Sequence, residues 1–407
     1  MPERSHSWPE GHWDWLIHLS HKHGLRCGPM MFVGGQVDKD SEGAVLNAYD
    51  QRAQTQVVMR HIDRVLAEFG AGLADVVKLV AYYVTDGSVD EGTFLADIAA
   101  ALGDRPGPAI TLVPLPWLAY PGMMVEIEAI AMLGTDGRRL ATEGAAPTGP
   151  QTMPAPFRHG LRCGEMIFLG GQVPRDGEGV VLHPGDIVGQ SELVMDHLGR
   201  VLGEFGASLD DAVKFNIYYR GDGTLGDWRR AAEVRARYFS EPGPAATGLP
   251  LPLLPEGEMI RMEVMAMLGT DGRRLPRRHV WPEGHWDWPI HLPYKHGLEC
   301  AGMIFIGGQV SLDTRGEVLD ADDMVAQTHT SMDNIRRVLE GFGLAMDDVV
   351  KVNGFYKGEA GPDTILTNQR IRSACFTEPG PASTGIPLKF LAIEGLAIEV
   401  EAIAMTR

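Results

Sequence analysis

An eight-residue segment, WPEGHWDW, occurs twice without a change, at residues 8–15 and 281–288. Each copy continues into a stretch that ends in Lys-His-Gly. Imidazole can move protons near neutral pH, an ammonium can hold an anion, and tryptophan offers a flat apolar surface. These residue types suit the wall of a small-molecule cleft. The candidate polar residues are His12, Asp14, His18, His21 and Lys22 in the first stretch, and His285, Asp287, His291, Tyr294 and Lys295 in the second.

Three interpretations of these two stretches stay open. They can wall a cleft, with histidine and lysine binding substrate and moving protons. They can instead be arms that pack across neighbouring parts of the chain, since large aromatic residues often hold interfaces together. His12, Asp14, His18 and His21 also offer zinc-type ligands, but their spacing matches no HExxH signature. We therefore expect no metal and no other cofactor.

Two carboxylates, Glu126 and Glu399, open a repeated Glu-x-Glu-Ala-Ile-Ala pattern. A carboxyl group beside an apolar wall has a raised pKa and can act as a general acid or base. The alternative is a solvated strand edge. The second glutamate of the pattern is present in every copy, which favours a structural carboxylate at a junction: Glu128, Glu263 and Glu401.

Three tandem copies of one unit position these residues. HGLRCGPMMFVGGQV begins at residue 23, HGLRCGEMIFLGGQV at 159 and HGLECAGMIFIGGQV at 296, so the offsets are 136 and 137 residues. A period this long indicates whole small domains rather than a solenoid. We expect unit 1 at 1–140, a divergent unit 2 at 141–275 and unit 3 at 276–407, with linkers at 141–156 and 276–280.

The hydrophobic pattern within one unit predicts an α+β fold. A β-sheet should carry two helices on one face. In unit 1 the expected order is a strand at 30–37, a helix at 49–69, a strand at 76–84, a helix at 93–102, and strands at 110–113 and 123–133.

Composition and net charge argue against several classes of protein. The chain has 407 residues and a formal net charge of −18, which argues against nucleic-acid binding and a polybasic membrane anchor. No apolar run approaches the roughly 18 residues of a membrane span, and four cysteines do not make a disulfide framework. We expect a cytoplasmic protein whose partner is a small molecule.

The repeated motifs resemble the RidA/YjgF family of small enamine and imine deaminases. The resemblance rests on the Gly-Gln strand end, the helix ending in Phe-Gly, the Asp-x-Val-Lys strand, the Gly-Pro-Ala turn and the final Glu-x-Glu-Ala strand. It implies chorismate-mutase-like units and, because the family forms homotrimers with clefts between subunits, an intramolecular pseudo-trimer. Such a chain would be a monomer or a small homo-oligomer.

The resemblance also implies roles for particular residues. The family acid that activates water matches Glu126 and Glu399, whereas unit 2 has Arg261 there. The family tyrosine matches Tyr294, and His21 takes its place in unit 1. Unit 3 is therefore the best candidate for catalysis, and unit 1 comes second.

One family residue is absent from all three units. The arginine that clamps the substrate carboxylate is replaced by Ile110, Ala246 and Ser383. Simple 2-imino acids should therefore be poor substrates, unless another cation replaces it. The candidate substitutes and neighbouring ligand-binding residues are Lys22, Lys295, Arg261, Thr111 and Thr384.

These observations predict a hydrolase or deaminase that acts on a C–N bond of a small metabolite, with a glutamate activating water. The alternative is a non-catalytic binding or scaffold protein that kept the pseudo-trimer and lost the deaminase residues.

Overall fold

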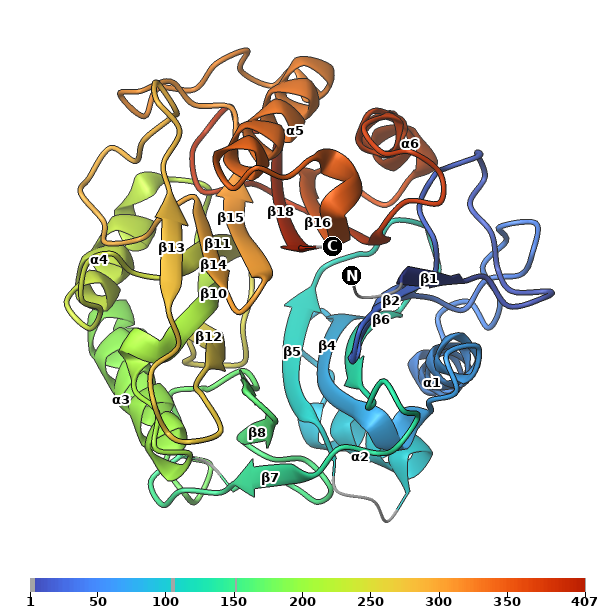
Figure 1. The fold of residues 1–407 in the computed structure, drawn as a ribbon, viewed down its shortest axis with the longest axis horizontal. Helices are drawn as coiled ribbons and strands as arrows, with labels where there is room; N and C mark the ends of the chain where they lie inside the picture. Colours follow the sequence, from blue (N-terminus) through green and yellow to red (C-terminus); the bar gives the residue numbers. More distant parts are fainter. Residues whose placement is uncertain (1–3, 104–106, 151, 407) are drawn as a thin grey trace.

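The computed structural model describes residues 4–103, 107–150 and 152–406 (Figure 1). These residues form three units, each with a six-stranded sheet and two α-helices. The α+β fold class expected from the sequence is confirmed.

Unit 1 has the strand order β1-β2-β3-β6-β4-β5. Within it, β4 and β5 are parallel and the other neighbours are antiparallel. Its elements are β1 (Arg4–Ser7), β2 (Gly24–Cys27), β3 (Met30–Gln36), α1 (Gln51–Ala67), β4 (Val76–Val84), α2 (Glu91–Leu102), β5 (Ala109–Leu115) and β6 (Val125–Met132).

Units 2 and 3 repeat this order. The elements of unit 2 are β7 (Thr142–Ala145), β8 (Gly160–Cys163), β9 (Met166–Leu169), α3 (Ile187–Glu204), β10 (Ala212–Arg220), α4 (Leu225–Ala236), β11 (Ala245–Leu251) and β12 (Ile260–Met267). Those of unit 3 are β13 (Arg277–Val280), β14 (Gly297–Cys300), β15 (Met303–Gln309), α5 (Met324–Gly341), β16 (Val349–Lys357), α6 (Pro362–Ala374), β17 (Ala382–Leu388) and β18 (Ile398–Met405).

Local sequence explains the long helix of unit 1. The side chain of Asp50 accepts a hydrogen bond from the backbone N–H of Ala53 and caps the first turn. Val58, Ile62 and Val65 recur at helical spacing and are buried. Gly70, at φ +75°, then turns the chain into the next strand.

The predicted central elements lie where the sequence places them, but the outer hairpins were not predicted. β1 and β2 have four residues each, too few for an alternating pattern to stand out. The stretch 276–280, expected as a linker, forms β13, and the expected linker 141–156 includes β7. Both strands pair at the edge of a sheet, so pairing rather than composition decides their structure.

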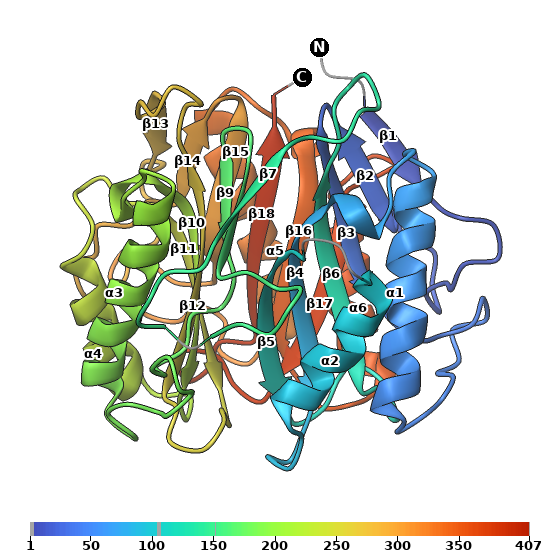
Figure 2. The same cartoon turned by 90° about the horizontal axis from the view of Figure 1, so that it is seen from below.

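The three units pack around one centre, with the sheets inside and the helices outside (Figures 1 and 2). The contacts are cyclic: β17 packs near β3, β11 near β15 and β5 near β9. The Gly-Gly-Gln repeats make this close approach possible. A Cβ on Gly34 would lie 2.5 Å from the carbonyl oxygen of Ser383, and one on Gly307 would lie 2.6 Å from that of Ala246.

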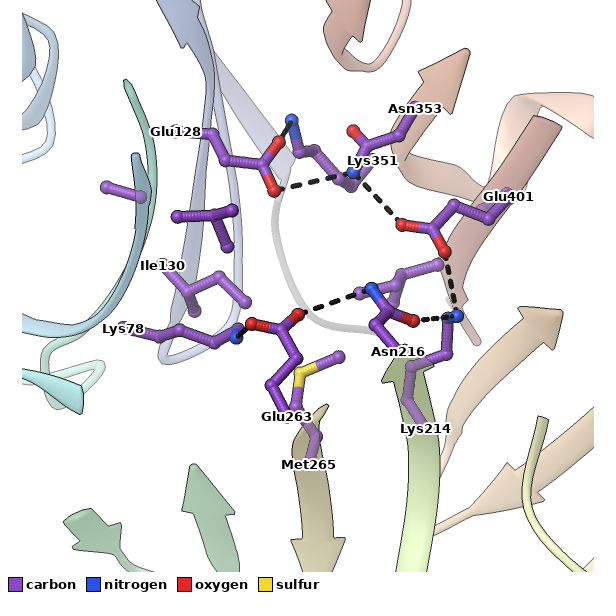
Figure 3. Close-up of a pocket in the computed structure, with 14 residues that line it drawn as sticks. Lys78, Glu128, Ile130, Lys214, Asn216, Glu263, Met265, Lys351, Asn353 and Glu401 are labelled. Atoms are coloured by element: carbon purple, nitrogen blue, oxygen red, sulfur yellow. Dashed lines mark hydrogen bonds and ion pairs between the residues drawn. The ribbon is translucent and has the colours of Figure 1, made fainter. Parts of the chain in front are cut away.

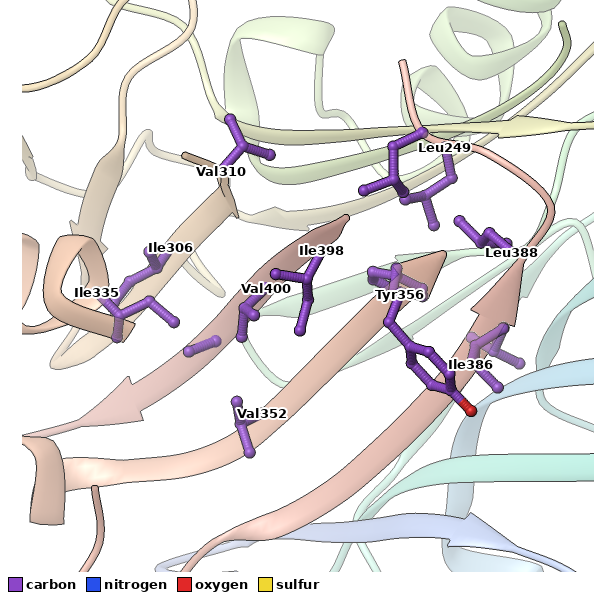
Figure 4. Close-up of a cluster of buried hydrophobic side chains, with 14 of the residues drawn as sticks. Leu249, Ile306, Val310, Ile335, Val352, Tyr356, Ile386, Leu388, Ile398 and Val400 are labelled. Carbon is purple, nitrogen blue, oxygen red and sulfur yellow. The ribbon is translucent and has the colours of Figure 1, made fainter. Parts of the chain in front are cut away.

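Apolar side chains fill both faces of each sheet. One cluster at the centre draws on all three units and includes Cys27, Cys163 and Cys300, which are buried free thiols as their apolar context predicts. Other clusters lie between sheets and helices, and Figure 4 shows the one around Val352, Ile398 and Val400 of unit 3. Within the described residues, no helix is long and apolar enough to cross a membrane.

Candidate functional site

A ring of ion pairs surrounds the centre of the molecule (Figure 3). Each pair joins a lysine of one unit to a glutamate of another, and the positive and negative charges balance. The N···O distances are 2.6 Å for Lys78–Glu263, 2.7 Å for Lys214–Glu401 and 2.8 Å for Lys351–Glu128. The expected junction role of these glutamates is confirmed.

The ring also uses two threonines that the sequence offers as ligand-binding residues. Thr111 donates its hydroxyl to Glu263, and Thr384 donates to Glu128 Oε2 at 2.6 Å. Thr384 in turn accepts from the backbone N–H of Gly35 at 3.0 Å. The ligand-binding role proposed for both is therefore corrected to a structural one, because glutamates already hold their hydroxyl protons.

Three equivalent interfaces lie where one unit meets the next, and we call each of them a cleft. We name them by their units: Glu126 faces unit 3 in the 1–3 cleft, Glu399 faces unit 2 in the 2–3 cleft, and Arg261 faces unit 1 in the 1–2 cleft.

The 1–3 cleft contains a small, partly open cavity. Aromatic residues and a lysine of unit 1 form one wall, and helix α6 and strand β17 of unit 3 form the other. The main lining residues are Trp13, Trp15, Lys39, Tyr120, Glu126, Ile365, Gln369, Ser383 and Gly385. This mixture of aromatic walls and a few polar groups is typical of small-molecule sites.

Glu126, on β6, is buried in this cavity with an exposure of 6%. Its carboxylate occupies the space above Gly35, where a Cβ would lie 1.9 Å from Oε1. Burial and the neighbouring Glu128 raise the pKa of Glu126 to about 8, although Lys351 and Lys39 act in the opposite direction. The group is therefore mostly protonated at neutral pH and can both donate and accept a proton.

Arg372, on α6, brings a buried guanidinium to the unit 3 side of the cavity. Its Nε donates to Asn368 Oδ1 at 3.0 Å and Nη1 donates to Ser383 Oγ at 3.4 Å, whereas Nη2 has no hydrogen-bond partner. Gly354 makes the room, because a Cβ there would lie 2.7 Å from Arg372 Cζ. Nη2 lies 3.3 Å from where a Cβ of Gly385, a cavity residue, would be.

The family clamp position has no arginine in any unit, but a guanidinium from another element lies at the 1–3 cleft. Position 383 lacks the arginine, but α6 delivers Arg372 to the same wall. Sequence reasoning missed Arg372 and also Lys39. A usable signal was the buried face of α6, where Asn368, Gln369 and Arg372 stand at positions that are apolar or alanine in α2.

The 2–3 cleft has a similar carboxyl group in different surroundings. Glu399 lies over Gly308, and burial together with Glu401 raises its pKa to about 8. Trp228, which stands where unit 3 has Ile365, lies 5.1 Å from Trp288 between ring centroids. A Cβ on Gly248 would meet Trp228 Nε1 at 3.8 Å, and a Cβ on Gly385 would meet Ile365 Cδ1 at the same distance, so the larger indole stands at the equivalent place.

Tyr294 does not accompany Glu399 in an open cavity. It is 7% exposed and packs against Phe239, with ring centroids 5.9 Å apart. Arg235, the counterpart of Arg372, lies beside the Tyr294 hydroxyl and partly offsets the rise in its pKa that burial causes. The tyrosine and the glutamate that the sequence pairs in unit 3 therefore have different surroundings, one of them within an aromatic cluster.

The 1–2 cleft is closed by ion pairs. Arg261 Nη1 and Nη2 donate to the two carboxylate oxygens of Glu91 at 2.6 and 2.8 Å, and its Nε and Nη2 donate to Glu258 Oε2 at 3.0 and 2.8 Å. Nη1 also donates to the carbonyl oxygen of Leu112 at 3.1 Å. The substrate-binding role considered for Arg261 is corrected, since protein acceptors use its donors.

The Trp-rich segment forms part of the cleft wall through Trp13 and Trp15. Its histidine lies behind that wall: His12 Nε2 and Gln36 Oε1 are 2.8 Å apart, and Trp13 Nε1 donates to the same oxygen at 3.1 Å. Burial lowers the pKa of His12 to about 4, so the ring is neutral. His285 repeats this arrangement with Gln309 in unit 3.

The remaining predicted residues lie outside the cavity lining. Lys22 Nζ and His18 Nε2 contact Glu378 at 2.7 and 3.0 Å. In unit 3, Lys295 and His291 contact Glu241 in the same way. These lysines therefore do not replace the clamp, because surface glutamates already pair with them.

The structure also gives the surroundings of the two predicted aspartates and of His21. Asp14 and Asp287 accept hydrogen bonds from the backbone N–H of Trp15 and Trp288 at 2.6 and 2.7 Å. His21 is 1% exposed, and burial holds its pKa well below the ordinary value. No group of three or more His, Cys, Asp or Glu in the described part of the chain is placed to hold a metal ion.

Comparisons with known proteins agree with this architecture. The family model for endoribonuclease L-PSP matches residues 18–133, 150–268 and 289–406. A RutC family protein of Pyrococcus abyssi is 35% identical over 111 residues, 27% of this chain and 85% of the relative. The 2-iminobutanoate/2-iminopropanoate deaminase of Escherichia coli is 33% identical over 119 residues, 28% of this chain and 88% of the relative.

One solved structure is similar over most of the chain. A chorismatase crystal structure aligns with a TM-score of 0.56 at 16% identity, covering 81% of this chain and 93% of that one. At this identity the likeness concerns the fold.

Proposed function

Because the chain belongs to the endoribonuclease L-PSP family, whose relatives include 2-iminobutanoate/2-iminopropanoate deaminases, we propose that it hydrolyses a C–N bond of a small anionic imine in the 1–3 cleft. One observation carries the proposal. A buried carboxyl group with a pKa of about 8 lines a cavity that also adjoins the unpaired Nη2 of Arg372.

Arg372 supports binding of an anionic substrate. A buried guanidinium without a carboxylate partner is costly, and an incoming carboxylate would offset that cost through charge-assisted hydrogen bonds. Its neighbours Asn368 and Ser383 are neutral, so they orient the group without neutralising it. The tryptophans of unit 1 supply apolar contact for the rest of the substrate.

Glu126 supports the proton transfers of imine hydrolysis. Its ionised form takes a proton from water as the water oxygen bonds to the imine carbon, and the protonated carboxyl group returns that proton to nitrogen. Glu126 then takes the hydroxyl proton of the resulting carbinolamine and passes it to the amine nitrogen as the C–N bond breaks, so that ammonia leaves and a carbonyl remains. A pKa near 8 keeps both forms of Glu126 accessible near neutral pH.

Ammonia release tests the proposal. Imines are generated in the assay by an amino acid oxidase, and their hydrolysis is followed with and without the full chain. Turnover should increase as the pH rises towards 8, because the ionised form of Glu126 accepts the first proton. Acceleration that persists in the Glu126→Gln variant would refute the assigned role, and retained binding without any acceleration would favour a binding protein.

A further inference from the structure

Lys39 adds a second buried cation to the 1–3 cleft. It is 3% exposed and lines the same cavity as Glu126. Its Nζ lies 4.2 Å from the ring centroid of Tyr120 and 5.6 Å from that of Trp13. Aromatic faces attract a cation but carry no net charge. Burial lowers the pKa of Lys39 to about 8, although the carboxyl groups of Glu126, Asp14 and Asp40 act in the opposite direction without forming an ion pair with it.

The cavity has an excess of positive charge. Neither Lys39 nor Arg372 has an ion pair with a carboxylate within 4.0 Å among the residues that the structure describes. Glu126 is the carboxyl group that lines the cavity, and burial keeps it mostly protonated at neutral pH. Two cations therefore meet little negative charge, in a chain whose net charge is −18.

The other two clefts show that the fold does not require an excess of positive charge at this place. In unit 3 the positions of Lys39 and Tyr120 hold Leu312 and Ile393. In unit 2 the position of Lys39 holds Arg175, which pairs with Glu258 at 2.5 Å. An unpaired cation at this position is thus a feature of the 1–3 cleft.

We infer that the 1–3 cleft selects a small dicarboxylate, with one carboxylate held by Arg372 and the other by Lys39. The inference rests on the proposed function, since it names the substrate class of that site. Two separate side chains, one from each unit, suit two separate anionic groups. A phosphate group would need several donors converging on one point, whereas Arg372 offers Nη2 as its unpaired nitrogen. Tyr120 Oη, also without a partner, adds a hydrogen-bonding group to the cavity.

Calorimetric binding of matched acids to the full chain tests this inference. Succinate and glutarate are compared with propionate and butyrate, and inorganic phosphate forms a separate arm. The dicarboxylates should bind at least about tenfold more tightly than the monocarboxylates, because each charged contact in a desolvated site contributes that much or more. Lys39→Leu, which copies Leu312 of unit 3, should remove the difference, and Lys39→Arg should restore most of it.

Lys357→Leu is the matched control, because Lys357 is exposed and pairs with Asp322. It should leave both affinities unchanged. Equal affinity of the unmodified chain for mono- and dicarboxylates would overturn the inference, and this comparison needs no variant to fold. Tighter binding of phosphate than of succinate, or an equal loss for both acid classes in Lys39→Leu, would also overturn it. Ammonia release is measured separately, so a chain that prefers dicarboxylates but accelerates no imine hydrolysis would refute the proposed function and leave the ligand class standing.

Discussion

The 1–3 and 1–2 clefts share one backbone framework and differ in where charge is neutralised. In the 1–3 cleft the final strand supplies Glu126 and the facing helix supplies Arg372, which has an unpaired nitrogen. In the 1–2 cleft the final strand supplies Arg261, and both Glu91 and Glu258 pair with it. Reversing the charge at one strand position thus accompanies the change from a cavity to a closed ion-pair network.

The 2–3 cleft differs from the 1–3 cleft in the residues that surround its glutamate. It keeps a glutamate whose pKa is raised to about 8, but Trp228 and Trp288 pack together across it. Ile217 stands at the position where Gly354 makes room for Arg372, and Arg235, whose Nε and Nη1 also lack partners, lies beside Tyr294 instead. A carboxyl group with a suitable pKa is therefore not sufficient without a space and a facing cation.

The largest expected effect tests the structural role of the 1–2 cleft. Arg261→Met leaves Glu91 without its cation and leaves Glu258 with Arg175 as its partner, and it should lower the free energy of unfolding by about 3 kcal/mol. Chemical denaturation measures this. Arg336→Met, which breaks exposed ion pairs, should change it by no more than about 0.5 kcal/mol. Ammonia release per folded molecule should survive Arg261→Met, and its loss would show that the 1–2 cleft takes part in the reaction.

The next prediction compares kcat after substitution of the glutamate in the 1–3 cleft and in the 2–3 cleft. Glu126→Gln should reduce kcat by at least about a hundredfold, because an amide cannot exchange the proton that general acid–base catalysis needs. Glu399→Gln is the matched variant, and its turnover should stay within about twofold of the unmodified chain. If Glu399→Gln were the inactive variant instead, the working cavity would have to be the 2–3 cleft.

A smaller effect is expected on substrate binding. Arg372→Met should raise KM for an anionic imine about ten- to a hundredfold with a lesser change in kcat, because a charge-assisted contact is lost. Arg235→Met should leave KM unchanged, and Arg372→Lys should recover part of the loss. Circular dichroism checks that each variant folds. Equal KM values for the two methionine variants would contradict the difference between the clefts.

The last prediction is a dependence of stability on pH that both glutamate clefts should share. The pKa of Glu126 is about 8 in the folded chain against 4.5 as the ordinary value, so between these values the folded state holds a proton that the unfolded state has lost. Stability contributed by this group therefore falls as the pH rises, by at most about 1.4 kcal/mol per pH unit. Denaturation of Glu126→Gln and Glu399→Gln from pH 5 to 8 should show a shallower fall in each, and a slope unchanged by either substitution would contradict the raised pKa.

The sequence by itself determined the repeat, the fold class and the two candidate acids. The offsets of 136 and 137 residues, the helical spacing in α1 and the alternating Glu126 and Glu128 are local patterns, and local patterns can be read without a structure. The sequence also suggested the aromatic cleft wall, because a short segment rich in tryptophan and polar residues is typical of a small-molecule site or an interface.

Tertiary structure alone decided which cleft holds the candidate site. Arg372 lies on a helix of unit 3 and reaches the cavity because Gly354, on a neighbouring strand, lacks a side chain. Lys39 and Glu126 lie far apart in the sequence of unit 1, and Trp228 of unit 2 packs against Trp288 of unit 3. Each of these facts depends on which side chains meet across an interface between units. The periodicity of one segment carries no information about its neighbour across that interface, so only the packed chain could show where a cation is left without a partner.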